Sequence, residues 1–187
     1  MASSAHSFAF LLFLMFFTFL FMNQLVSCDQ QTEDRINYVC RQMEEYGFCD
    51  KTFNQNLKGP TADYVDLTLI TIEQSLLNAS NTNTYIERLG RSTKPGALKN
   101  ALIECNNVYN SIMQSFRNAN MYYKQKNYNA MIMSESVTPR LIESCITCFL
   151  TPPLHPMGPL ETMNRQMRML CSMALVTGHQ LQSKKLK

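Results

Sequence analysis

The cysteines are the residues with the most chemistry to offer. Cys145 and Cys148 are separated by two residues, a spacing found in zinc sites and in thioredoxin-type redox motifs. A zinc site would need a second pair of ligands at similar spacing, and only the lone His155 and Cys171 follow. A redox motif would need a strand–helix–strand setting, whereas this sequence is helical in its periodicity. We therefore interpret the two cysteines as members of two different disulfide bridges.

Cys105 lies on the apolar face of an expected helix. In ALIECNNVYN, residues 101–110, it aligns with Leu98, Ala101 and Val108. A buried free thiol is one interpretation, because cysteine packs well as a small hydrophobe. A metal ligand, a nucleophile and half of a disulfide are the alternatives, and the cellular compartment helps to choose among them.

The other residue types do not assemble into a known catalytic pattern. His155 and His179 belong to no HExxH motif, and the chain has neither a GxSxG elbow nor a glycine-rich phosphate loop. Glu44 and Glu45 are adjacent, so on a helix their side chains diverge and cannot act as a facing acid and base. We predict no catalytic residues, no metal and no cofactor.

The N-terminus indicates which compartment the chain enters. Residues 8–22, FAFLLFLMFFTFLFM, are apolar except for one threonine and are followed by small and polar residues. This length suits a signal peptide, whereas a spanning helix needs about 20 apolar residues. We predict a signal peptide over residues 1–28, cleaved after Ser27 or Cys28, and a secreted, extracellular mature chain of residues 29–187 without a membrane anchor.

The mature chain has the length of one domain and keeps the whole formal net charge of +3. This mild charge allows an acidic protein or an acidic wall polysaccharide as partner, gives no reason to expect nucleic acid, and also suits an ordinary soluble surface. An even number of cysteines in a secreted chain favours bridges over free thiols. They are Cys40, Cys49, Cys105, Cys145, Cys148 and Cys171, which allow 15 pairings. The sequon at Asn78 is a candidate glycan site if it is exposed.

Four stretches repeat apolar residues every three or four positions, as one face of a helix does. They cover about 61–90, 97–123, 127 onward and 160–181. Thr61 is a plausible N-cap of the first, and the polar patch NASNTNT at 78–84 can interrupt it. Pro139 predicts a kink or break in the third, and LTPPLHPMGP at 150–159 predicts a loop before the fourth.

These elements predict an all-α fold, an up-and-down antiparallel four-helix bundle over about 61–182. Short helical pieces over about 30–55 precede it, and two cysteines nine positions apart could close them into a hairpin. In the last helix we expect Met163 and Met167 in the core, whereas Met169 and Met173 fall nearer the flank, where they can be exposed.

Three motifs in order resemble the plant invertase/pectin methylesterase inhibitor family. CRQMEEYGFC at 40–49 is similar to its N-terminal cysteine pair, and ALIECNNVY at 101–109 is similar to its Ala-Leu-x-x-Cys-x-x-x-Tyr pattern. YKQKNYNAMIMSESVTPRLIESCITCF resembles the segment with a central serine that ends in Ser/Thr-Cys-x-x-x-Phe, placing Ser136, Cys145 and Phe149 on family positions. The resemblance covers about Tyr38 to Leu181.

The resemblance implies two bridges, Cys40 to Cys49 and Cys105 to Cys145. It also implies a secreted inhibitor of the apoplast, or less favourably of the vacuole, that binds one enzyme molecule and covers its active-site cleft. We lean toward pectin methylesterase, because the 150–159 loop lacks the Pro-Lys-Phe element associated with some inhibitors of the alternative target, invertase (β-fructofuranosidase).

Cys148 and Cys171 depart from the family pattern, and we predict that they form a third bridge. Pro139 is a second departure, since it interrupts a segment that the family pattern leaves regular. An alternative from another class is a secreted helical protein that stores or binds a lipid or another small apolar ligand. The cysteine spacings argue against it, because the adjacent cysteine pair of lipid-transfer proteins is missing.

Overall fold

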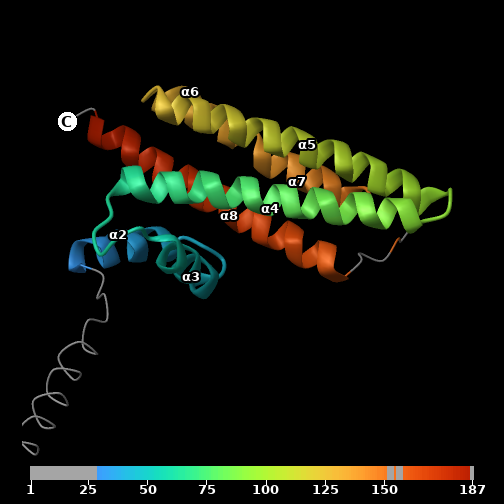
Figure 1. Ribbon diagram of the computed structural model, residues 1–187, viewed down its shortest axis with the longest axis horizontal. Helices are drawn as coiled ribbons and strands as arrows, with labels where there is room; N and C mark the ends of the chain where they lie inside the picture. The colour runs from blue at the N-terminus through green and yellow to red at the C-terminus, as the bar shows by residue number, and fades with distance from the viewer. Residues whose placement is uncertain (1–28, 151–153, 155–157, 186–187) are drawn as a thin grey trace, which may run out of the picture.

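The computed structural model describes residues 29–150, Leu154 and residues 158–185. The expected signal peptide and most of the proline-rich loop, including His155, lie outside these residues. Every regular element of the described part is a helix (Figure 1). The helices are α2 (Gln30–Cys40), α3 (Tyr46–Asn56), α4 (Tyr64–Ser92), α5 (Ala97–Lys124), α6 (Tyr128–Ser136), α7 (Thr138–Thr147) and α8 (Gly158–Lys185).

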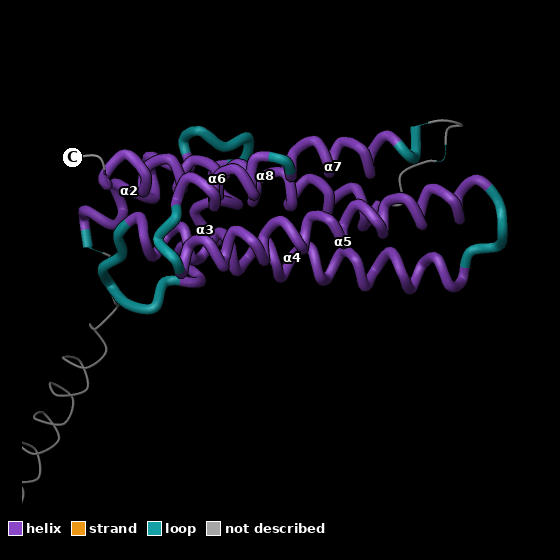
Figure 2. The backbone as a smooth tube through the Cα atoms, turned by 90° about the horizontal axis from the view of Figure 1, so that it is seen from above, coloured by secondary structure: helices purple, strands orange, loops and turns teal. Residues whose placement is uncertain are grey.

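The long helices form the predicted four-helix bundle. α4 packs against α5 and α8, while α6 and α7 together take the place of one helix between α5 and α8. Figures 1 and 2 show α4 and α5 running antiparallel, α6 and α7 following one another in the direction opposite to α5, and α8 running opposite to α7. None of the helices in residues 29–150 and 158–185 has both the length and the apolar character needed to cross a bilayer.

The first bundle helix begins at a different residue from the one expected. Its N-cap is Asp63, not Thr61. The Asp63 carboxylate accepts from the backbone N–H groups of Val65 and Asp66, and the Asp66 carboxylate accepts from the backbone N–H of Asp63. This reciprocal arrangement is a capping box, which satisfies donors that a helix end leaves free. A threonine two residues earlier cannot reach the same donors.

The polar patch at 78–84 does not interrupt α4, because its side chains find partners within the bundle. Asn106 of α5 donates to Asn83 at 2.9 Å, and Asn83 is within 3.4 Å of Asn110. Thr82 is buried and donates back to the carbonyl of Asn78 at 2.8 Å. These bonds satisfy polar groups that would otherwise oppose burial, so the helix continues without a break.

The third bundle helix is broken at the predicted place. α6 ends at Ser136, Val137 joins it to α7, and Pro139 lies in the first turn of α7. Proline is tolerated there because the first N–H groups of a helix have no intrahelical acceptor. The Thr138 hydroxyl donates to the Glu135 carbonyl at 2.6 Å and partly replaces the interrupted backbone ladder.

The hairpin of α2 and α3 packs beside the bundle, against α4 and α8. The Cys40–Cys49 disulfide closes it. Its first helix is tied to the connection before α4, because Ala62 donates to Thr32 at 2.8 Å and accepts from Arg35 at 2.7 Å. The hairpin is therefore held by a disulfide between its two helices and by hydrogen bonds from α2 to the segment before α4.

The core lies along the axis of the bundle. Fully buried large side chains come from every helix except the hairpin's first, and burying each contributes roughly 1.5–3 kcal/mol. They are Tyr109, Phe53, Phe116, Leu67, Ile72, Ile86, Leu102, Ile112, Met131, Ile142, Leu160 and Met167. Met169 and Met173 are also buried, which corrects the expectation that they could be exposed at the flank of α8. Both fit the core because α8 is covered on several sides, by α4, α6, α7 and the hairpin.

A second disulfide, Cys105–Cys145, joins α5 to α7. The prediction of a third bridge between Cys148 and Cys171 is wrong, because both thiols are free. Cys171 is buried, with its sulfur 3.1 Å from the Thr138 hydroxyl in the first turn of α7. Cys148 lies ten residues farther along that helix, a distance of about 15 Å at 1.5 Å per residue. A disulfide needs Cα atoms within about 7 Å of each other, so these two cannot pair.

We expect the two bridges to stabilise the protein to different degrees. The Cys105–Cys145 bond closes a loop of 40 residues and the Cys40–Cys49 bond one of 9 residues. Loop entropy then assigns them about 4 and about 3 kcal/mol. Urea unfolding of the double variants C105A/C145A and C40A/C49A, compared with the parent chain, measures both losses. A smaller loss for C105A/C145A than for C40A/C49A would contradict this ranking.

Candidate functional site

The residues first considered for catalysis do not converge. Within residues 29–150 and 158–185, no three His, Cys, Asp or Glu side chains are arranged so that they could hold a metal ion. Cys145 of the Cys-x-x-Cys pair is bonded to Cys105, and the Cys148 thiol contacts the carbonyl of Ser144 on its own helix. The pair therefore provides neither two metal ligands nor a redox couple. The structure directs attention to surfaces instead.

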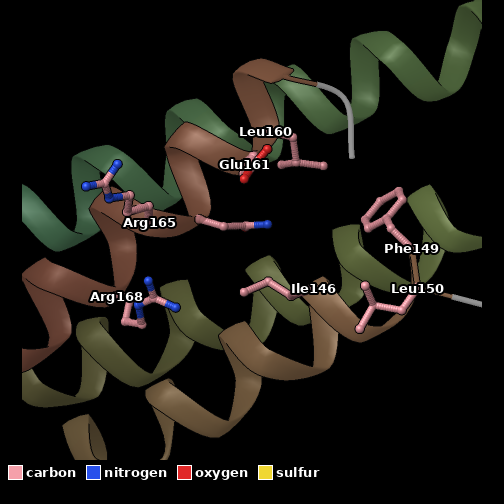
Figure 3. Close-up of a pocket in the computed structure, with 8 residues that line it drawn as sticks. Ile146, Phe149, Leu150, Leu160, Glu161, Arg165 and Arg168 are labelled. Carbon is pink, nitrogen blue, oxygen red and sulfur yellow. The ribbon is translucent and has the colours of Figure 1, made fainter. Parts of the chain in front are cut away.

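A pocket of about 300 Å³ lies where α7 ends and α8 begins (Figure 3). Ile146, Phe149 and Leu150 line it from α7 and the residues after it, and Leu160 closes it from α8. Glu161, Asn164, Arg165 and Arg168 of α8 give its polar edge. The volume is at the lower end of the range for small-molecule sites.

The two arginines of this pocket already have acidic partners. Arg165 pairs with Glu45, and Arg168 pairs with Glu44 at 3.2 Å and with Glu143 at 3.8 Å. All of these side chains are partly exposed, so each pair is worth little by itself. Together they link the turn of the hairpin to α7 and α8. Sequence reasoning missed this role because Glu44 and Arg168 are 124 positions apart.

The inner wall of the pocket is attached to the bridged part of the bundle. Asn164 is buried and accepts a hydrogen bond from the Tyr109 hydroxyl at 2.7 Å. Burial raises the pKa of Tyr109 well above its usual range, so this hydroxyl stays protonated and keeps donating. The Cys145 sulfur lies 3.6 Å from the same Asn164 oxygen. The pocket is thus held in a fixed shape.

A second hollow, of about 290 Å³, lies near the turn between α4 and α5. Its apolar side chains include Ile86, Leu102 and Ile103. Its cations are engaged: Lys99 donates to the Gly90 carbonyl at 2.6 Å, and Arg91 pairs with Glu87 at 3.5 Å. A cation at the end of α4 compensates the negative end of the helix dipole, so Lys99 has a structural role here.

Several large apolar side chains remain exposed on the bundle and the hairpin. Met133 of α6 is 72% exposed, and Val137, at the break four residues later, is 50% exposed. The others of more than two-fifths exposure are Tyr38, Tyr46, Leu77, Ile103, Met121 and Leu150. Exposed apolar groups on a rigid helical surface can contact a protein partner without any chemistry.

The candidate glycan site is not on a loop. Asn78 lies in the middle of α4, is half-buried, and donates to Gln166 of α8 at 3.4 Å. Its side-chain oxygen is buried without a partner among the described residues. A glycan on the Asn78 nitrogen would have to replace the contact with α8, so the position does not suit a surface modification.

One buried acid was not anticipated from the sequence. Glu135 of α6 is fully buried, and neither carboxylate oxygen has a hydrogen-bond partner among the described residues. Burial raises the pKa of this carboxyl to about 8. Its sequence context, SES at 134–136, is typical of a surface segment. Its burial and its lack of a hydrogen-bond partner are visible only in the three-dimensional structure.

The free thiols give a direct test of the cysteine arrangement. In the chain of residues 29–187, we expect two thiols to be titrated after denaturation and one, Cys148, to be alkylated readily in the folded protein, because Cys171 is buried. Mass spectrometry of peptides after native alkylation identifies the modified residue. The variant C148A is the control and should show no rapid labelling. Recovery of a Cys148–Cys171 disulfide peptide under non-reducing conditions would contradict the structure.

Comparisons with known proteins agree with the fold. A curated relative from Platanus acerifolia, described as "Putative invertase inhibitor", is 26% identical over 146 residues, which cover 75% of this chain and 78% of the relative. A crystal structure of a mutant form of a pectin methylesterase inhibitor from Arabidopsis superposes with a TM-score of 0.69 at 17% identity, covering 77% of this chain and 95% of the other. A second Arabidopsis thaliana pectin methylesterase inhibitor gives 0.61 at 17% identity, with 79% and 96% covered.

The family comparison spans both the hairpin and the bundle. The family model described as plant invertase/pectin methylesterase inhibitor matches residues 34–176, which is well over half of the chain. The match includes both disulfides, the broken third helix and the pocket between α7 and α8. Members of this family are protein inhibitors, and the all-helical, twice-bridged fold agrees with that class. This chain belongs to the plant invertase/pectin methylesterase inhibitor family.

Proposed function

We propose that this protein binds a cell-wall pectin methylesterase as a one-to-one complex and blocks access to its active-site cleft. The family match over residues 34–176 carries the general class, a proteinaceous inhibitor of pectin methylesterase or invertase. The choice of enzyme is our own step. It is supported by the sequence of the 150–159 loop, which lacks the Pro-Lys-Phe element associated with some invertase inhibitors.

Occlusion requires a rigid surface rather than reactive groups. A stable complex of standard size buries roughly 800 Å² on each partner. Binding is weakened by the entropy lost when loops and side chains become ordered, so a preformed surface favours affinity. Two disulfides, the buried Tyr109–Asn164 bond and the ion pairs of Arg165 and Arg168 all reduce the freedom of this bundle before it meets a partner.

Secretion is part of the same proposal. Asp29, the first residue of the predicted mature chain, caps α2 by accepting from the N–H of Gln31 at 2.8 Å and from the Thr32 hydroxyl at 2.9 Å. These bonds lower the pKa of the Asp29 carboxyl, so it remains charged at mildly acidic pH. Cleavage just before Asp29 would leave this cap intact, which supports residues 29–187 as the functional chain.

Invertase is the second candidate target. The curated Platanus acerifolia relative is described as an inhibitor of that enzyme. Its sequence identity with this chain, 26%, is higher than the 17% of the pectin methylesterase inhibitor structure. The two targets are separable by assay, because one enzyme releases methanol from methylated pectin and the other splits sucrose.

The proposal predicts loss of pectin methylesterase activity at an equimolar amount of the mature chain. Both enzymes are titrated with the protein at mildly acid pH, with reduced and alkylated protein as the control for folded structure. Complete titration of pectin methylesterase near one equivalent, with invertase unaffected, is the expected result. Inhibition of invertase alone would keep the family function and overturn our choice of target.

The same titration includes a fluorescent fatty acid, which addresses the small-ligand alternative. The pocket between α7 and α8 has about 300 Å³, and its two arginines are already paired with acids, so we expect no uptake. Uptake of the fatty acid together with failure to inhibit either enzyme would replace the inhibitor function with that of a ligand-binding protein.

A further inference from the structure

Glu135 is in an environment that disfavours its charged form. It is fully buried at the penultimate position of α6, with both carboxylate oxygens unpartnered among the described residues. An ionised carboxylate buried without a partner is strongly unfavourable, so such groups either pair or remain protonated. Here the described residues provide no cation that pairs with it, and burial alone raises the pKa of the carboxyl to about 8.

The carboxyl lies beside a glycine on α8. A Cβ atom added at Gly178 would lie 3.4 Å from the Glu135 Oε2 and 3.1 Å from both Ile132 and Met131. The carboxyl therefore lies against α8 backbone and two apolar side chains. No hydroxyl or amide in this contact donates to it.

The ionisable groups on the neighbouring helices do not stabilise the charged form of Glu135. Cys171 of α8 faces Glu135, and Tyr109 of α5 lies next to Cys171; burial keeps both protonated, so neither provides a positive charge. The packing helices carry cations such as Arg117 and Lys124 of α5, Arg140 of α7 and His179 of α8, and these side chains are exposed. Glu135 is thus the one acid in this contact that changes charge between pH 5 and 9.

α6 is also a short helix without a disulfide of its own. It has only 9 residues, bounded by its Asn127 cap and by the break at Val137. Isolated helices of this length are marginal in water, so α6 depends on its packing against α5 and α8. The bridge to α5 is at Cys145 in α7, beyond the break, and does not hold α6. α6 can therefore open locally while α7 stays attached.

We propose that α6 is a pH-gated segment: it stays packed on α8 while Glu135 is protonated and opens locally when Glu135 ionises. The direction follows from linkage. The packed state keeps the proton up to about pH 8, whereas a solvated glutamate loses it near its ordinary value of 4.5. Packing is therefore most stable below about pH 4.5, and the open fraction rises about tenfold per pH unit until about pH 8.

The buried thiol beneath α6 reports this opening. Cys171 lies next to Glu135 of α6, and its sulfur is 3.1 Å from the Thr138 hydroxyl in the first turn of α7. Burial raises the pKa of this thiol to about 12, so Cys171 is unreactive while α6 is packed. Once exposed, a thiol is alkylated in proportion to its thiolate fraction, which rises about tenfold per pH unit. The two effects multiply, giving a labelling rate that rises about a hundredfold per pH unit.

The experiment measures alkylation rates of Cys171 and Cys148 in the same sample between pH 5 and pH 8, at low reagent concentration. In the parent chain, the logarithm of the Cys171 rate should rise with a slope of about two per pH unit, against about one for Cys148. E135Q is nearly isosteric and cannot ionise, so its Cys171 slope should fall to about one. A parent slope of one, or an unchanged slope of two in E135Q, would overturn the proposal.

Hydrogen exchange separates local from global opening. Amides of residues 128–136, corrected for the intrinsic pH dependence, should lose protection as pH rises in the parent chain, while those of α4 and α5 keep theirs. Sub-denaturing urea should barely change the Cys171 rate, because a local opening exposes little surface. A urea dependence equal to that of global unfolding would also overturn the proposal. Protection of the α4 and α5 amides in E135Q shows whether that variant is folded.

Discussion

The disulfide bond between Cys105 and Cys145 is the constraint on which the broken third helix depends. A nine-residue helix and a ten-residue helix are each too short to be stable by themselves. The bond attaches α7 to α5 irrespective of packing. The inner wall of the pocket between α7 and α8 is joined to α5 as well, because Asn164 of α8 accepts a hydrogen bond from Tyr109 of α5. α6 has no such disulfide, so the two sides of Val137 differ in how firmly they are held.

Polar contacts inside the bundle fix which helix faces which. The Asn83, Asn106 and Asn110 amides align α4 with α5, and the Thr71 and Thr177 hydroxyls, 3.3 Å apart, align α4 with α8. Apolar packing alone would tolerate shifts of one helix along another, because it has little direction. Directional bonds between named pairs exclude those shifts. A protein whose task is to present a surface benefits from that uniqueness.

Most of the architecture could be predicted from the sequence. Apolar periodicity and turn residues placed the four bundle helices, and Pro139 marked the break between α6 and α7, because these signals are local. Signals that depend on three-dimensional distance failed. An even cysteine count suggested a third bridge, but Cys171 lies near the wrong end of α7 for Cys148. The ion pairs of Glu44 and Glu45 and the burial of Glu135 likewise depend on which helices pack together, which spacing along one helix does not reveal.

The glycine at 178 has a consequence for how this sequence can change. Any side chain there would press on Met131 and Ile132, each 3.1 Å from its Cβ, whereas the Glu135 carboxyl at 3.4 Å would be at ordinary contact distance. Loss of the glycine would therefore require the Met131 and Ile132 side chains to shift or to be replaced by smaller ones. Gly178 and these two α6 residues, more than 40 positions apart in the chain, therefore share one volume between α6 and α8.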